Sequence, residues 1–205
     1  MGGCCSSSED DVEVVELNNV TNAAVQCQGG KCGSNIKMSR SEGGDFKVSG
    51  SGVMLGSCCL DCDIAYWEIK VLKGGASVNI GLKKFHAKRP VSLEGTLKSE
   101  NDGKGNEPEW VLLREYLPKD CPELKEGDVI GVHWDQTDFP MVCFTLNGVF
   151  LPNASITRIR PAQDIYPAIS VVGDGQVLTR FSGDNFEHKP IASKFVPIVC
   201  ATNLI

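Results

Sequence analysis

Two short runs of alternating apolar residues, separated by a polar turn, constrain the fold of this chain more than any other feature. The first run covers residues 130–134 and the second covers residues 142–146. Alternation with a period of two, in runs rich in β-branched and aromatic residues, predicts strands that each bury one face. Asn147-Gly148 follows the second run, and this pair supplies the positive φ angles that a tight type I′ turn needs. We therefore expect an antiparallel hairpin, with a short third strand folding back over residues 149–151.

The parity of the two runs predicts their register. In both runs the buried positions carry even numbers, and a slip of one residue would turn every buried side chain outward. Residues that face each other across the hairpin must therefore have numbers of equal parity. The simplest such pairing joins three core pairs and one outer pair: Trp134 with Val142, Val132 with Phe144, Ile130 with Leu146, and His133 with Cys143.

Three motifs of the chain resemble the signature of the SPRY domain family. The first is the hairpin, where Glu-Gly-Asp-Val-Ile-Gly begins at residue 126 and Phe-Thr-Leu-Asn-Gly begins at residue 144. The second is Ala-Tyr-Trp-Glu-Ile-Lys-Val from residue 65, followed by Asn-Ile-Gly-Leu from residue 79, and the third is Ile-Tyr-Pro-Ala-Ile-Ser from residue 165. The resemblance covers residues 34–205. It implies one all-β domain over that range, a two-layer antiparallel β-sandwich of the jelly-roll, concanavalin-like kind.

The composition agrees with a β domain and argues against several functional classes. The chain carries a net charge of −6 with 22 Gly and 10 Pro. An acidic chain without a clustered basic face is poorly suited to bind nucleic acid. No run approaches the roughly 20 apolar residues of a transmembrane helix, and no secretory signal follows the start. The 10 cysteines are therefore expected as reduced thiols rather than as a disulfide framework.

The first six residues, Met-Gly-Gly-Cys-Cys-Ser, match the pattern for N-myristoylation. A single myristoyl chain binds membranes only marginally, so stable anchoring needs a second signal. A basic patch cannot supply that signal, because residues 6–16 contain acidic residues and no Lys or Arg. We therefore expect myristoylation of Gly2 and palmitoylation of Cys4 and Cys5, on a largely disordered acidic tail over residues 1–33. The alternative is that these residues form an unmodified tail.

The family resemblance implies that a protein partner binds through loops at one end of the sandwich. Carried onto this chain, it points to Lys83 and Lys84 after one strand, to Val172 and Gly173 in the last hairpin, and to Thr96 nearby. Some family members carry Trp at the place of Gly173, and this chain does not. Their specificity for peptides that contain Asn is therefore not expected here.

Residues 83–96 form the one local basic cluster of the acidic chain. We interpret them as a loop that contacts an acidic partner, while a solvated loop without function is the alternative. Aromatic side chains dominate the energetics of interfaces. Phe85 in this loop and Phe139 in the turn of residues 135–140 are therefore predicted as further partner-binding residues.

Other functional classes are weaker. Cys143 opposite His133 would suit a thiol enzyme, but no third group orients the imidazole, and both residues lie in the middle of strands. A sandwich lectin that uses Trp134 is disfavoured, because the register buries this residue. Cys59 and Cys62 form one C-x-x-C pair, but no second pair or nearby His completes a zinc site. The sequence therefore predicts a monomeric, non-catalytic protein-binding adaptor on the cytosolic face of a membrane, with no cofactor, metal or nucleic-acid ligand.

Overall fold

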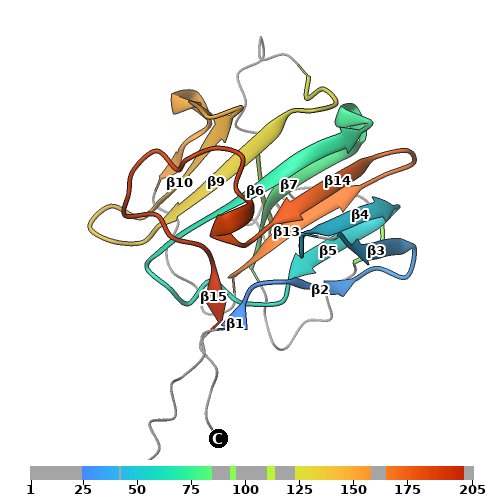
Figure 1. Cartoon of the computed structure of the whole chain (residues 1–205), viewed down its shortest axis with the longest axis horizontal. Coiled ribbons are helices and arrows are strands. Elements are labelled where there is room, and N and C mark those ends of the chain that lie inside the picture. The colour runs from blue at the N-terminus through green and yellow to red at the C-terminus, as the bar shows by residue number, and fades with distance from the viewer. Residues whose placement is uncertain are drawn as a thin grey trace, which may run out of the picture.

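The computed structural model describes residues 25–41, 43–84, 93–95, 110–113, 123–157 and 165–200. Two antiparallel β-sheets pack face to face and form a β-sandwich of the jelly-roll kind (Figure 1). This architecture confirms the fold class that the alternating runs and the family motifs predict.

The larger sheet has eight strands in the order β11-β10-β9-β6-β14-β4-β3, and β12 also pairs with β10. In chain order its strands are β3 (Ile36–Arg40), β4 (Phe46–Gly50), β6 (Ile64–Lys73), β9 (Val129–Asp135), β10 (Met141–Leu146), β11 (Val149–Phe150), β12 (Ile156–Thr157) and β14 (Gln176–Arg180). The long strand β6 and the hairpin β9–β10 form its centre.

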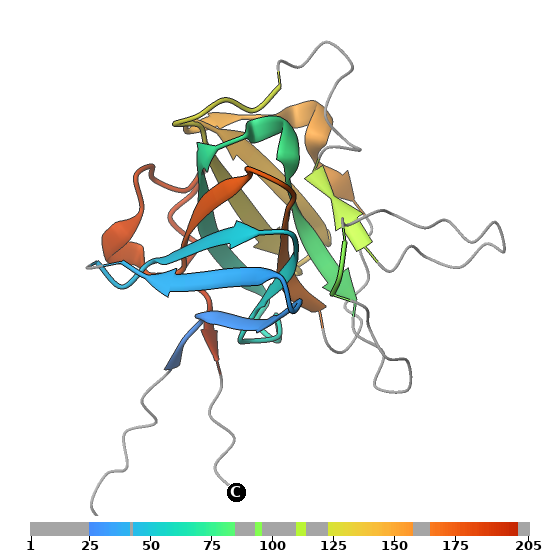
Figure 2. The ribbon, with the colours of Figure 1, turned by 90° about the vertical axis from the view of Figure 1, so that its right-hand side faces the viewer.

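The smaller sheet has five strands in the order β2-β5-β13-β7-β8. Its strands are β2 (Gly29–Cys32), β5 (Gly52–Gly56), β7 (Val78–Lys84), β8 (Trp110–Leu112) and β13 (Ile165–Val171). Strands β1 (Val25–Gln26) and β15 (Val199–Cys200) pair with each other and lie side by side at one end of the sandwich (Figures 1 and 2).

The described helices are three single turns of 3₁₀ helix, namely η1 (Gly75–Ser77), η2 (Pro152–Ala154) and η3 (Gly183–Asn185). Over the described ranges, no helix has the length and apolar character needed to span a bilayer.

The hairpin β9–β10 has the register that parity predicts. Trp134 pairs with Val142, and His133 pairs with Cys143. Trp134 and Phe144 are fully buried in the core between the sheets. Asn147 and Gly148 both have positive φ angles, of 50° and 78°, as a type I′ turn requires.

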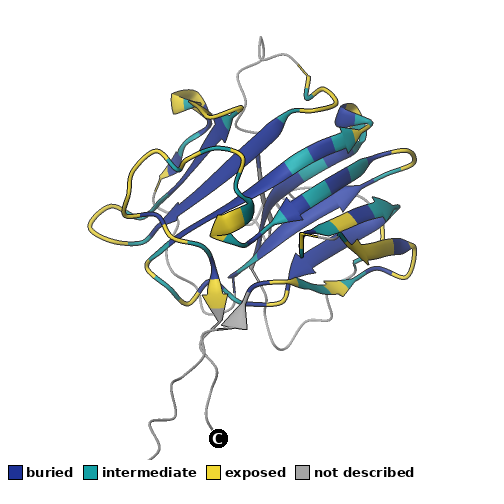
Figure 3. Cartoon of the chain, in the orientation of Figure 1, coloured by how far each residue is buried: buried dark blue, intermediate teal, exposed yellow. Residues whose placement is uncertain are grey.

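The core fills the space between the two sheets. In β6, Trp67, Ile69 and Val71 point into it and are fully buried, as their alternation predicts. Figure 3 shows this burial in the central strands of both sheets, while exposed residues concentrate in the turns.

The outer face of the larger sheet is also covered. Residues 186–198, which we call the covering segment, cross in front of β6 and β9 (Figure 1). The N–H of Tyr66 donates to the carbonyl of Val196 at 2.7 Å. The ring of Phe195 meets His133 edge to face, with 4.9 Å between the ring centroids. The central strands β6 and β9 therefore bury both faces over most of their length.

Three expectations need correction. Strands β1 and β2 precede residue 34, so the folded domain begins by Val25 rather than at residue 34. Lys83 and Lys84 end strand β7 instead of starting a loop, because they continue its ladder with β13. Cys58 is disulfide-bonded, so it is not the reduced thiol that the sequence predicts. Among the described residues, Cys27, Cys32, Cys59, Cys62 and Cys143 are not in disulfide bonds.

Candidate functional site

The sandwich has two ends, which the strand registers define. The turn end carries the β13–β14 turn of residues 172–175, where Gln176 pairs with Lys73 at the close of β6. The terminal end carries β1 and β15. Ile64 at the start of β6 pairs with Asp135 at the close of β9 there.

The predicted partner-binding residues do not share one end. Val172 and Gly173 lie at the turn end, where the Gly173 N–H donates to Ser51 Oγ at 3.1 Å. Lys83 and Lys84 lie at the opposite end of the same sheet, because they pair with Tyr166 and Ile165 at the start of β13. A single contact surface therefore cannot include all of them.

Several predicted positions fall outside the part of the chain that the structure describes. They are Gly2, Cys4, Cys5, Phe85 and Thr96. The predictions for lipidation and for these two contact residues therefore stay predictions.

Lys83 is not a surface residue. Its side chain is 1% exposed, and it lies on the outer face of the smaller sheet beside Tyr166. The sequence predicted a partner-binding loop here, because Lys83 and Lys84 begin the basic cluster and carry no signal of burial. Direct contact of its ammonium group with a partner is excluded in this conformation.

Phe139 lies at the terminal end, in the turn between β9 and β10. Its side chain is 57% exposed, the large value expected of a contact residue. Asp135 fixes the start of this turn, because its Oδ1 accepts hydrogen bonds from the Thr137 N–H at 3.0 Å and the Thr137 hydroxyl at 2.6 Å. Phe139 is thus presented to solvent on an anchored turn.

A pocket of about 380 Å³ opens at the terminal end of the smaller sheet. Its described lining comes from β2, from the end of β5 and from the start of β13, and consists of Gly30, Lys31, Leu55, Gly56, Ser57 and Tyr166. Leu55 belongs to a small apolar cluster against which Tyr166 packs. The volume is within the range of sites that bind small molecules or single side chains.

The rim of this pocket is held by backbone hydrogen bonds. The Ser57 N–H donates to the Gln28 carbonyl at 2.8 Å, and the Gln28 N–H donates to Ser57 Oγ at 2.9 Å. Sequence analysis missed the pocket because one of its walls, Gly30 and Lys31 of β2, comes from the segment assigned to the tail. The Tyr-Pro-Ala motif at Tyr166 was the one signal that pointed to this region.

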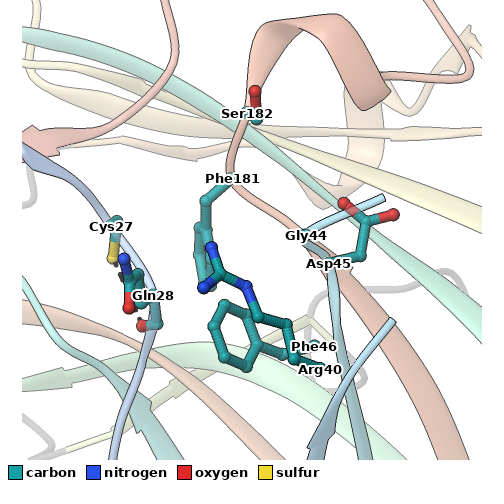
Figure 4. Close-up of a pocket in the computed structure, with 8 residues that line it drawn as sticks. All are labelled: Cys27, Gln28, Arg40, Gly44, Asp45, Phe46, Phe181 and Ser182. Atoms are coloured by element: carbon teal, nitrogen blue, oxygen red, sulfur yellow. Dashed lines mark hydrogen bonds between the residues drawn. The ribbon is translucent and has the colours of Figure 1, made fainter. Parts of the chain in front are cut away.

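A second, smaller pocket of about 30 Å³ lies nearby, where β3 and β4 meet the segment after β1 (Figure 4). The guanidinium carbon of Arg40 lies 5.7 Å from the centroid of the Phe46 ring. Cys27 and Gln28 lie across the pocket from these two side chains. The pocket has room for about one water molecule.

The pair His133 and Cys143 does not have the geometry of a thiol–imidazole couple. The Cys143 thiol donates to Met141 Sδ at 3.5 Å. His133 Nε2 accepts the N–H of Ile191 at 3.2 Å. Burial raises the pKa of the Cys143 thiol and lowers the pKa of His133 to about 4. A reactive thiolate needs the opposite shift of the thiol, so the arrangement weighs against the enzyme alternative.

Trp134 is 1% exposed, and its Nε1–H donates to the Cys62 carbonyl at 2.9 Å. The lectin alternative, which needs an accessible Trp134, therefore does not fit. Within the described residues, no three His, Cys, Asp or Glu side chains are grouped so that they would hold a metal ion.

No model of a known protein family matches the sequence, and no curated protein sequence matches it. Solved structures do resemble the fold. The PSpry domain of TRIM65 matches with a TM-score of 0.51 and 15% identity, over 76% of this chain and 88% of that chain. The SPRY domain of human HERC1 matches with a TM-score of 0.43 and 15% identity, over 71% and 94% of the two chains.

The NEUZ (NHR) domain of Neuralized from Drosophila melanogaster matches with a TM-score of 0.47 and 15% identity, over 75% and 90% of the two chains. Of these three, only the TRIM65 match has a TM-score above one half. The chain therefore has a SPRY-like fold, and the comparisons support no narrower assignment.

Proposed function

We propose that this protein is a non-catalytic interaction module that captures a protein partner at the terminal end of its sandwich. We further propose that acyl chains on Gly2, Cys4 and Cys5 hold it at the cytosolic face of a membrane. The observation that carries the partner site is the 380 Å³ pocket beside Tyr166.

Two features favour this site over the turn end, and the fold supports protein binding in general. Tyr166 offers an aromatic side chain at the pocket, and aromatic anchors in pockets carry much of the binding energy at interfaces. Phe139, with 57% of its side chain exposed, lies at the same end. The SPRY-like fold adds weight, because SPRY domains bind protein segments at one end of the sandwich.

The tether rests on sequence alone. The chain from Gly2 to Val25 would link the acyl groups to β1, which lies at the terminal end. A partner bound there would be held close to the same membrane. Two lipid chains are needed, because one myristoyl chain gives only marginal binding.

One cell experiment tests both parts. Cells express the full chain with a C-terminal proximity-labelling enzyme, as wild type, Gly2→Ala, Tyr166→Ala or Val172→Ala. We expect Gly2→Ala to leave the membrane fraction and to lose incorporation of an alkyne myristate. We expect Tyr166→Ala to stay on the membrane but to lose its labelled partners.

Val172→Ala is the matched control, because it changes the turn end and leaves the pocket intact. This variant should stay in the membrane fraction and should keep its labelled partners. Unchanged fractionation of Gly2→Ala would remove the tether. Loss of partners in Val172→Ala, with retention in Tyr166→Ala, would move the partner site to the turn end.

A further inference from the structure

We infer that the free edge of β3 binds an acidic, extended peptide segment of a partner as an added β-strand. The inference concerns a second surface and gives the chemistry of its ligand, and it rests on the proposed function only in assuming a protein partner. Among the described strands, β3 closes the larger sheet, because β4 is its one neighbour in the strand order. An edge strand carries a row of backbone groups that another chain can pair with.

The register of β3 shows which backbone groups are free. In an antiparallel pair, hydrogen-bonded and non-hydrogen-bonded positions alternate. The Ser41 N–H donates to the Asp45 carbonyl at 2.8 Å, and the Ser51 N–H donates to the Asn35 carbonyl at 3.1 Å. Odd-numbered residues of β3 therefore bond to β4.

The even-numbered residues Met38 and Arg40 point their N–H and carbonyl groups away from β4. Neither residue has another backbone hydrogen bond within the described ranges. Met38 is also 37% exposed, which is unusual for a large apolar side chain in a strand. The edge thus offers the outward backbone groups of two residues, and no described strand pairs with them on that side.

The charge on this edge is positive and uncompensated. Lys37 and Lys47 point to the same outer face of the sheet, because Ser39 pairs with Lys47 and Lys37 pairs with Ser49 next to it. Both lysines are exposed. Like charges at neighbouring cross-strand positions destabilise a sheet. Neither lysine forms an ion pair with any residue that the structure describes.

Arg40 adds a third cation at the end of β3. Its one described polar contact is the cation–π contact with Phe46, so guanidinium donors are free beside the small pocket (Figure 4). The nearby carboxylate of Asp45 is already used, since it binds Arg180 at 3.3 Å and Asn185 at 2.6 Å. An incoming carboxylate would therefore meet a cation without a competing acid.

Other cations of the larger sheet already have acidic partners. Lys70 binds Glu187 at 2.9 Å, and Lys73 lies 3.8 Å from Asp174. A strand with acidic residues at alternate positions would place carboxylates on the outer face beside Lys37 and Lys47, while its backbone pairs with Met38 and Arg40. The Arg40 side chain points to the opposite face and would meet a carboxylate at the end of the added strand. The occupant is thus an acidic segment in extended conformation.

The test uses the full chain and a fluorescein-labelled peptide of alternating Val and Glu, eight residues long, with anisotropy as the readout. We expect saturable binding that weakens as salt rises. Replacing Glu by Gln in the peptide should weaken it about tenfold, because the ion pairs with the lysines are lost.

Two protein variants separate charge from backbone pairing. Lys37→Glu with Lys47→Glu should weaken binding by about tenfold or more. Met38→Pro should abolish binding, because proline removes an outward N–H that β4 does not use, and edge strands tolerate proline. A melting temperature within a few degrees of wild type shows that each variant is folded. Lys125→Glu with Lys189→Glu is the matched charge control and should change binding by about twofold at most.

Several results would overturn the inference. If Lys125→Glu with Lys189→Glu weakens peptide binding as much as Lys37→Glu with Lys47→Glu does, the attraction is diffuse and not specific to β3. If folded Met38→Pro binds the peptide as tightly as wild type, the peptide does not pair with β3. Tighter peptide binding after Glu9, Asp10, Asp11, Glu13 and Glu16 become amides means that the chain's own tail occupies the edge. A dimer that Met38→Pro dissolves means that a second copy occupies it. Tyr166→Ala should leave peptide binding unchanged, so this inference and the proposed pocket fail separately.

Discussion

At the scale of single residues, His133 shows how burial by a distant segment changes the chemistry of a strand residue. Its side chain is 1% exposed beneath the covering segment, and its Nε2 accepts the N–H of Ile191. Burial lowers its pKa from 6.5 to about 4, because the cation would lose its hydration. The neutral form is therefore the one that the fold requires.

This shift predicts a loss of stability in mild acid. Between about pH 6.5 and pH 4 the unfolded chain binds a proton at His133 and the folded chain does not. The contribution of neutral His133 to the free energy of unfolding is therefore fully present above pH 6.5. The free energy of unfolding falls by about 3 kcal/mol as the pH drops towards 4. Urea unfolding at pH 7 and pH 4.5 measures the loss.

His133→Gln is the control for the pH effect. Glutamine keeps an acceptor for the Ile191 N–H but does not titrate. The variant should lose less stability than wild type between the two pH values. Equal losses in both proteins would show that another group causes the acid sensitivity.

At the scale of an element, β9 is shaped by the close approach of its neighbours. At Gly131 a Cβ atom would clash with Thr145 Oγ1 and lie 2.7 Å from the Tyr66 hydroxyl. The Tyr66 hydroxyl is held in place because it donates to Glu68 at 2.8 Å. The absence of a side chain at Gly131 therefore lets β6, β9 and β10 pack on their outer face.

Gly131→Ala should destabilise the fold by about 1–3 kcal/mol, the usual cost of overpacking. Gly173→Ala is the comparison, because nothing lies within 4 Å of its Cβ position and only its φ of 60° opposes the change. That conformation costs about 1–2 kcal/mol per residue. Urea unfolding measures the stability of both variants. An unchanged free energy of unfolding in Gly131→Ala would contradict the packing argument.

At the scale of the whole molecule, the covering segment adds a third layer, and it forms hydrogen bonds with one buried carboxylate. Glu68 is fully buried and accepts the N–H groups of Glu187 at 2.7 Å and His188 at 2.8 Å. Arg180 lies 3.5 Å from the same carboxylate. The charge of Glu68 is thus balanced by donors from the segment and from β14.

Glu68→Gln should cost about 3–5 kcal/mol, because a buried amide nitrogen replaces one acceptor oxygen and faces an N–H donor, and because Arg180 loses one of its three carboxylate partners. The covering segment should open first, so the amide of Tyr66, which donates to Val196, should exchange hydrogen faster. Lys70→Gln is the control. It removes an ion pair with Glu187 in which both partners are partly exposed, and such pairs contribute about 0–1 kcal/mol. Similar losses in the two variants would contradict the role assigned to Glu68.

The sequence by itself determined the central hairpin, the register of β9–β10 and the core face of β6. These features depend on local alternation and on the turn pair Asn147-Gly148, which act over a few residues. The same alternation predicted that Trp134 is buried, and it is. The separate family motifs predicted the sandwich as a whole.

Only the tertiary structure decided what lies on the outer faces and at the two ends. Lys83 is buried, His133 is shielded and Val172 is separated from Lys84, although no local pattern marks any of these outcomes. The pocket beside Tyr166 likewise joins three strands that are far apart in the chain. Local periodicity fixes which way a side chain points within its strand. Which residues that side chain then contacts depends on which distant segment packs against the strand. That packing depends on contacts across the whole fold.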